Sequence, residues 1–317
     1  MENHRHLPGV LTVTVIAVMI AASELFGERE IIFPEIAAIA VGMLLAPRRP
    51  WQTSRARVLV LITLSAVVGL AVSVLLPLPL WEKMCVAFLL AQVLLIFGGT
   101  SFAPLISAAA LPVMLGTESL VYLIAAVSLT ALVLLVSFVL ERLGLRAPEP
   151  YRPVHPPEGR GWGRVMLRCL LGCVCIALAV TLRLRYMAAP PMLVAFTEFM
   201  NPVSRAKEQP VKAVALIALC AAAGAISRLA LTVALGLPLT VSAIAAGVIL
   251  LWLLREFGML LPPAAALTVL AMLIPQSDLI VYPIEILAGV AVLMGLAKLT
   301  DALAEARGRY AAQHTVK

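Results

Sequence analysis

The chain has 317 residues, of which 62% are hydrophobic and only 13% are charged, and its mean hydropathy is +1.04. A soluble domain is roughly half apolar and a quarter charged, so this composition excludes an ordinary soluble protein. The formal net charge of +7 would suit a nucleic-acid partner or anionic lipid. The basic residues, however, cluster in loops beside apolar runs, which is typical of orientation in a bilayer. We expect a lipid bilayer around the protein and no nucleic-acid partner.

Apolar runs of helical length recur along the whole chain. A hydrocarbon core of roughly 30 Å needs about 20 apolar residues in a helix, and backbone polar groups in lipid must be satisfied within their own segment. The sequence predicts an all-α, polytopic helical membrane protein with about twelve transmembrane segments. The predicted helices are 8–26, 31–47, 58–78, 84–98, 101–116, 119–140, 164–182, 188–202, 213–234, 239–254, 259–274 and 279–300. Two of them, 101–116 and 259–274, are short, at about 24 Å.

Basic residues mark four regions as cytoplasmic by the positive-inside rule. They are Arg48, Arg49, Arg55 and Arg57; Arg142, Arg146, Arg152, Arg160, Arg164 and Arg168; Arg205, Lys207 and Lys212; and Arg307, Arg309 and Lys317. Consecutive markers must be separated by an even number of crossings, and twelve crossings satisfy this. If the two short segments were re-entrant instead, the central linker would lie outside and break the rule. We predict a multi-pass protein of the bacterial inner (cytoplasmic) membrane with both termini cytoplasmic.

An internal repeat is visible at an offset of about 160 residues. Leu-Pro-Leu opens an apolar run that ends in Phe-Gly in both 78–98 and 237–258, and Val121-Tyr122 recurs as Val281-Tyr282. Six crossings per repeat predict two parallel six-helix repeats, related by an axis along the membrane normal. The predicted units are a first transmembrane repeat at 1–143, a cytoplasmic linker at 144–163, a second transmembrane repeat at 164–305 and a cytoplasmic tail at 306–317.

Enzyme signatures such as H-E-x-x-H, G-x-S-x-G and the P-loop are missing from the sequence. The four histidines, at positions 4, 6, 155 and 314, all fall in the tails or the linker. Cys169 and Cys173 share a helix face and would suit a soft metal, although free cysteine is also an ordinary packing residue. We expect no enzymatic activity, no metal and no cofactor.

Proline opens several of the predicted short helices, at Pro104, Pro190, Pro191, Pro262 and Pro263. Proline suits the first helical turn, where its missing N–H costs nothing. A helix that begins inside the membrane directs free N–H groups and a partial positive charge inward, which favours an anion. The prolines are therefore candidate substrate-binding positions. The alternative is that they only start helices at the membrane interface.

Ionisable residues within apolar segments are costly and indicate function. Arg228 and Glu285 are both predicted to lie roughly 10 Å deep, where they would pair or face one cavity; the alternative is a structural ion pair between helices. Glu198 would relay protons, or bond Thr197 or a neighbouring helix. All three are candidate substrate-binding residues.

Four acidic residues are expected near the outer face: Glu24, Glu35, Glu118 and Asp278. Capping of a helix explains Glu35, and solvation explains the other three.

From Pro190-Pro191-Met192 to Pro275 the pattern resembles the HPP family of integral membrane proteins. The shared features are a proline-initiated short helix, an Asn201-Pro202 turn with basic residues, two longer spans, and the run 261–266, which is similar to the family's His-Pro-Pro motif with Leu261 in place of His. The literal His155-Pro156-Pro157 lies in the polar linker. A second resemblance is to the fusaric-acid-resistance and aromatic-acid exporter group, whose repeats begin with an Arg-bearing span, as in 164–168, although its usual large cytoplasmic domains are missing here.

The first resemblance implies a permease for a small, nitrite-like anion, working as a secondary transporter or as a channel. The second implies an exporter of aromatic or organic acids. A non-transporting scaffold or regulatory subunit is the third hypothesis, and it predicts no polar cavity between the repeats. Homo-oligomerisation is left open by the sequence.

Overall fold

The computed structural model describes residues 6–159, 161–202 and 204–314, and within them all regular structure is helical. This confirms the predicted all-helical class. The α-helices are α1 (Leu7–Phe26), α2 (Glu35–Ala40), α3 (Arg55–Leu75), α4 (Leu80–Phe97), α5 (Leu105–Leu115), α6 (Leu120–Arg142), α7 (Gly161–Thr181), α8 (Pro190–Phe199), α9 (Pro210–Ser227), α10 (Leu239–Glu256), α11 (Pro262–Leu270) and α12 (Tyr282–His314). Two of these helices continue as π-helices, α2 through Val41–Leu45 and α9 through Arg228–Ala234.

Eight of the described helices are long and apolar enough to cross a membrane: α1, α3, α4, α6, α7, α9, α10 and α12. Their outward faces are apolar as well; Ile124 on α6, for example, is 65% exposed. Exposed apolar faces suit lipid as the surrounding solvent. The protein is therefore a multi-pass helical membrane protein.

The other four α-helices, α2, α5, α8 and α11, are short. The 11 residues of α5 rise only about 16 Å, well below a core of roughly 30 Å. The expectation of two short segments is therefore corrected to four, because the predicted spans 31–47 and 188–202 also contain only a short helix. All nine residues of α11 are buried. Burial within protein, away from lipid, is what lets the irregular backbone at the ends of such helices exist at membrane depth.

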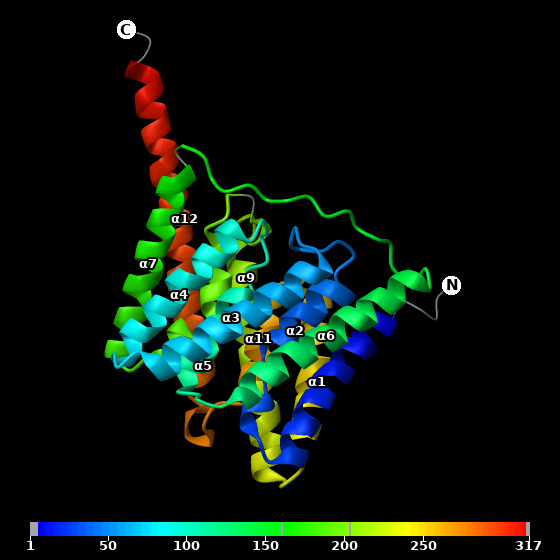
Figure 1. The fold of residues 1–317 in the computed structure, drawn as a ribbon. Coiled ribbons are helices and arrows are strands. Elements are labelled where there is room, and N and C mark those ends of the chain that lie inside the picture. Colours follow the sequence, from blue (N-terminus) through cyan, green and yellow to red (C-terminus); the bar gives the residue numbers. More distant parts are fainter. Residues whose placement is uncertain (1–5, 160, 203, 315–317) are drawn as a thin grey trace.

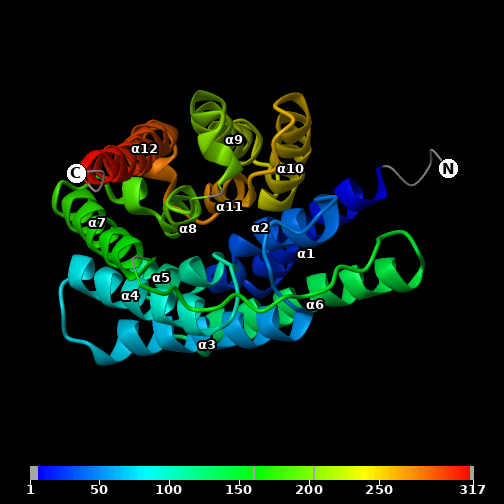
Figure 2. The same ribbon diagram turned by 90° about the horizontal axis from the view of Figure 1, so that it is seen from above.

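The short helices form the centre of the molecule. Seen from above, α9, α10 and α12 lie along one side and α3, α4 and α6 along the other, with the four short helices between them (Figure 2). Helices α1 and α7 close the two ends of this arrangement, α1 against α10 and α7 against α4.

Helix contacts in the first half recur in the second. Helix α3 packs on α5 and α6, as α9 packs on α11 and α12. Contacts between the halves are also reciprocal, since α4 meets α7 while α10 meets α1, and α5 meets α8 while α11 meets α2.

Two glycines permit the closest of these approaches. A Cβ atom on Gly69 would lie 2.2 Å from the carbonyl oxygen of Ala109, and one on Gly224 would lie 2.2 Å from that of Thr268. Small residues of this kind let membrane helices bring their backbones together. Helix α3 therefore touches the backbone of α5 in the first half, and the corresponding helix α9 touches the backbone of α11 in the second.

Two tyrosines fix the other side of the short helices. The hydroxyl of Tyr122 donates to the Ala108 carbonyl at 2.8 Å, and that of Tyr282 donates to the Leu267 carbonyl at 2.6 Å. Pro112 lies inside α5, four residues after Ala108, and has no N–H to give that carbonyl. Leu267 lies in the last turn of α11, whose carbonyls lack helical partners. Each tyrosine therefore satisfies a carbonyl that its helix leaves free.

The linker crosses one end of the molecule from α6 to α7 (Figure 1). It packs closely there: the N–H of Val154 and the hydroxyl of Tyr151 both donate to the Gly99 carbonyl, at 3.0 and 2.6 Å. Helix α12 continues to His314, so residues 306–314, expected in the tail, extend this helix beyond the bundle. Residues 315–317 lie outside the described part.

Candidate functional site

A cavity of about 360 Å³ lies between the two halves of the chain, on the side of the linker. Three parts of the chain line it. Its polar lining comprises Thr100 and Ser101 from the segment between α4 and α5, His155 from the linker, and Arg164, Arg168, Thr197, Glu198 and Asn201 from α7, α8 and the residues that follow.

Arg168 is the strongest electrostatic feature of this cavity. It stands one helical turn after Arg164 on α7, so both side chains project from the same face. The Nε atom of Arg168 is buried and has no hydrogen-bond partner in the described residues. None of the five ion pairs found there includes Arg168. A half-buried guanidinium that forms no ion pair favours an anion beside it.

Glu198 lies at the C-terminal end of α8 and faces the same cavity. Its carboxylate accepts a hydrogen bond of 3.0 Å from the indole N–H of Trp51. The partner expected from the sequence was Thr197 or a neighbouring helix, whereas Trp51 belongs to the segment between α2 and α3. Thr197 instead accepts a hydrogen bond of 3.0 Å from the side-chain amide of Gln92 on α4. Both bonds join the second half to the first beside the cavity.

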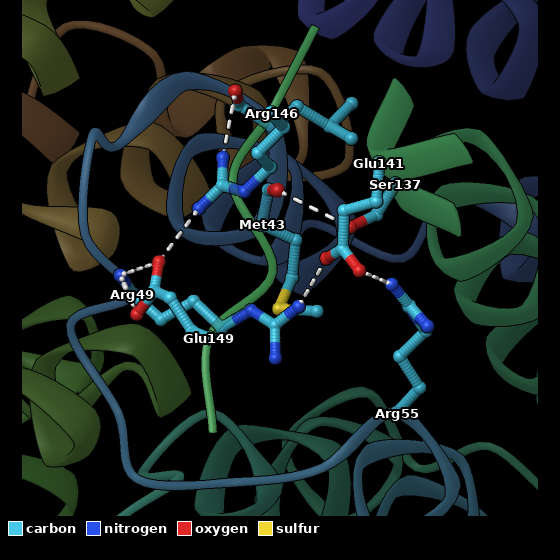
Figure 3. Close-up of polar contacts among 8 residues, drawn as sticks. Met43, Arg49, Arg55, Ser137, Glu141, Arg146 and Glu149 are labelled. Atoms are coloured by element: carbon cyan, nitrogen blue, oxygen red, sulfur yellow. Dashed lines mark hydrogen bonds and ion pairs between the residues drawn. The ribbon is translucent and has the colours of Figure 1, made fainter. Parts of the chain in front are cut away.

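A network of charged residues fixes the start of the linker (Figure 3). Glu141 forms ion pairs with Arg49, at 2.6 Å, and with Arg55. Arg146 donates to the Leu44 carbonyl at 3.0 Å, and Glu149 accepts from the backbone N–H of Arg49 at 3.0 Å. Burial lowers the pKa of Arg146.

Several arginines that the sequence marked only as signals of orientation are thus structural partners of carboxylates. They hold the linker against the end of α2, and the linker carries His155 to the cavity. No function is predicted for His155 from the sequence, because it lies in a polar segment. In the sequence, Arg168 is an orientation marker and part of the Arg-bearing span 164–168, and its spacing from Arg164 at the start of an apolar helix is a usable signal.

The structure does not bring Arg228 and Glu285 together. Arg228 donates to the carbonyls of Ala271 and Ile274, at 2.8 and 2.6 Å, and Glu285 accepts from the backbone N–H of Tyr186 at 2.9 Å. No ion pair joins the two side chains in the described residues, so the predicted pair is wrong. Carbonyls at a helix C-terminus carry a partial negative charge, and those that follow α11 bind the guanidinium in place of a carboxylate.

A polar cluster surrounds Glu285 away from the linker. Asp278 accepts hydrogen bonds of 2.6 Å from the Tyr186 hydroxyl and from Arg185. The bonds from Tyr186, Ser277 and Arg185 lower the pKa of Asp278 to about 2, and burial together with the bond to Asp278 raises the pKa of Tyr186. Asp278, expected to be solvated, is partly exposed and forms an ion pair with Arg185.

The five proline positions are buried at the starts of α5, α8 and α11, as predicted for helix initiation. They do not converge on the cavity. Ala103, next to Pro104, lines it, but α8 presents its C-terminal end, far from Pro190 and Pro191.

Glu35 is the polar residue whose setting the sequence misjudged most. It begins α2, but it is 1% exposed in the core, where its carboxyl group is hydrogen-bonded to Ser107 of α5. Its second oxygen has no partner in the described part of the chain. Glu35 is therefore enclosed by other side chains, because α2 starts inside the protein. Glu24, expected to be solvated, accepts from the N–H groups of Leu239 and Thr240 at the start of α10.

Searches of protein-family models, of curated proteins and of solved structures find no match for this chain. Its site is therefore defined by the residues above and their contacts.

Proposed function

We propose that the protein is a secondary transporter or channel-like permease for a small anion, and that the cavity beside Arg168 is its binding site. One observation carries this proposal. The Arg168 guanidinium lines a cavity between the two halves and has no carboxylate partner among the described ion pairs. A bound anion would supply the missing charge. A scaffold would not require such a cavity.

The anion would be held by charge and by hydroxyl groups. Arg164 and Arg168 provide positive potential from α7. Ser101 and Thr197 also line the cavity, and their hydroxyl oxygens accept bonds from Gln52 and Gln92, so their own protons remain free to donate. Charge-assisted hydrogen bonds of this kind are roughly twice as strong as neutral ones. The Glu198 carboxylate, held by Trp51, lies in the same lining and would repel the anion, which keeps binding weak enough for release.

The cavity would be one state of an alternating-access cycle. The reciprocal helix contacts support two parallel six-helix repeats in the bacterial inner membrane. The positive-inside rule places both termini and the linker in the cytoplasm, so this cavity would open to the cytoplasm. Rocking of one half against the other, at the contacts of α4 with α7 and of α5 with α8, would close it.

The size of the cavity supports a second candidate substrate class. A volume of about 360 Å³ falls at the lower end of the range for pockets that hold drug-sized ligands, about 300–1,000 Å³. It leaves room beyond that needed by a nitrite-like ion, which favours an aromatic or organic acid. Export of such acids is the alternative function.

The test compares Arg168→Ala and Arg168→Lys with the wild type. Nitrite and benzoate serve as probes, first for thermal stabilisation of the purified protein and then for flux in proteoliposomes. Loss of a hydrogen bond to a charged group costs about 1.5–3 kcal/mol, so we expect Arg168→Ala to weaken anion binding about 10- to 100-fold. Arg168→Lys keeps the charge but not the planar guanidinium group, so its anion affinity should lie between those of the wild type and Arg168→Ala.

Arg142→Ala is the matched control, because that arginine lies over the Phe138 ring on α6 and does not line the cavity. It should leave binding unchanged. Equal stabilisation of the wild type and Arg168→Ala by both probes would contradict the proposal. Stabilisation by benzoate alone would favour the organic-acid alternative.

A further inference from the structure

A second and larger hollow runs along the outer side of α1 and α10. Its volume is about 1110 Å³. On α1 its lining residues recur every three or four positions, from His6 through Val10 and Ala17 to Ala21, so they form one helix face. Helix α10 supplies the opposite wall, from Thr240 to Arg255.

The two walls run in opposite directions. Glu24, near the end of α1, bonds the N–H groups of Leu239 and Thr240 at the start of α10. His6, at the other end of α1, therefore lies at the same end of the groove as Arg255, near the end of α10. Both positively chargeable lining residues are thus at one end, and neither belongs to an ion pair found among the described residues.

The rest of the groove is mainly apolar and open to the outside. Val10, Val18 and Val248 line it with exposed fractions of 59%, 47% and 55%. Trp252 is 58% exposed and lies one turn from Arg255. Tryptophan is enriched at the level of lipid headgroups, so its position matches the charged end.

The groove is long enough for an acyl chain. From His6 to Ala21 helix α1 rises about 22 Å, compared with roughly 15 Å for half of the hydrocarbon core. An acyl chain that starts at the charged end would therefore lie beside apolar walls along its whole length.

We propose that this groove binds one anionic phospholipid, with its phosphate at Arg255 and His6 and an acyl chain along the apolar walls. The charge at only one end, the long apolar walls and the exposed tryptophan together fit a molecule with one anionic head and long apolar tails. Basic residues beside apolar helices are the usual feature that recognises anionic lipid headgroups.

The test is native mass spectrometry of the full chain, titrated with phosphatidylglycerol, phosphatidylethanolamine or phosphatidylcholine. We expect one phosphatidylglycerol to bind at least 10-fold more tightly than phosphatidylcholine. Arg255→Ala should remove most of that preference, and His6→Ala a smaller part. Ala17→Trp, which fills the groove, should abolish retention of all three lipids.

Two controls keep the experiment specific. Ile124→Trp introduces the same side chain at an exposed position on α6 outside the groove, and Arg142→Ala removes a basic residue that does not line it. Both should bind lipid like the wild type. Equal affinity for the three lipids, or an unchanged preference in Arg255→Ala, would overturn the proposal. A dimer that is lost in Ala17→Trp would show a second copy as the occupant and would overturn it as well.

Discussion

The two halves of the molecule make equivalent backbone contacts but place different polar groups at them. Gly69 and Gly224 let the backbones of α5 and α11 approach closely. The hydroxyls of Tyr122 and Tyr282 donate hydrogen bonds to carbonyls of the same two short helices. One turn after each glycine, however, the residue differs. Ser73 donates to the Pro112 carbonyl at 3.4 Å, whereas Arg228 donates to that of Ala271 at 2.8 Å. Arg228 therefore has a polar structural counterpart in Ser73.

This difference shows which features a helix contact constrains. A backbone that passes at van der Waals distance requires glycine, and a carbonyl without a helical partner requires a donor. The donor itself can be a hydroxyl or a guanidinium, so charge can change between halves while the packing stays. Glu35 and Ser107 also differ from their counterparts in the second half. Aligning Pro34 with Pro191 places Met192 opposite Glu35. Aligning Ala108 with Leu267, whose carbonyls accept from the two tyrosines, places Ala266 opposite Ser107.

The largest expected effect comes from the two glycines. Gly69→Ala and Gly224→Ala each place a methyl group 2.2 Å from a backbone oxygen, so each should destabilise the protein by about 3 kcal/mol. Thermal unfolding in detergent measures this. Gly295→Ala is the control, because nothing lies within 4 Å of its added carbon, and removal of a helical glycine should stabilise by about 0.5–1 kcal/mol. Clearly unequal losses of unfolding free energy in Gly69→Ala and Gly224→Ala would show that the two halves are not packed in the same way.

The tyrosines should give the next largest effect. Tyr122→Phe and Tyr282→Phe each leave a buried carbonyl without a donor, which we expect to cost about 2 kcal/mol in either half. Chemical unfolding of the two variants, monitored by circular dichroism, checks the prediction. A cost in only one half would show that the other carbonyl has found a second donor.

A substitution at Glu35 tests the polar difference directly. Glu35→Met gives the first half the residue of the second and removes a buried carboxyl group that has one unpartnered oxygen. Such a replacement is often neutral, so the thermal unfolding free energy should change by less than about 1 kcal/mol. The double variant with Ser107→Ala should be no less stable than Glu35→Met alone. A loss above about 2 kcal/mol would assign Glu35 a structural role that its bonds do not show.

The smallest effect concerns Asp278 and depends on pH. Its pKa of about 2 lies below the ordinary value of 3.8, so its ionised form stabilises the fold above about pH 4, and this contribution is lost as the pH falls through about 2. Exposed pairs contribute about 0.2–1 kcal/mol. Asp278→Asn should therefore be less stable than the wild type by that amount at pH 7, and the gap should close toward pH 2.

Differential scanning fluorimetry across this range measures the gap. Glu118→Gln, at an exposed carboxylate that belongs to no ion pair in the described residues, is the control. A gap that stays constant with pH would mean that Asp278 acts through packing alone.

The sequence by itself determined the class of the molecule. Long apolar runs force helices, because lipid offers no partner for backbone groups, and proline before small residues sets where short helices begin. The matched tyrosines of the two halves were also visible as a repeat, in Val121-Tyr122 and Val281-Tyr282. These features depend on local composition and on spacing along the chain, so they could be predicted without coordinates.

Only the tertiary structure decided which polar residues meet. Trp51 reaches Glu198 across 147 positions, and Ser107 reaches Glu35 across 72. Whether an ionisable side chain is buried, paired or left beside a cavity depends on helices distant in sequence. In the sequence, Arg168 is one of several arginines that are expected to be cytoplasmic. Its distinguishing property is that it forms no ion pair in the described residues, and this depends on the side chains that the fold places around it.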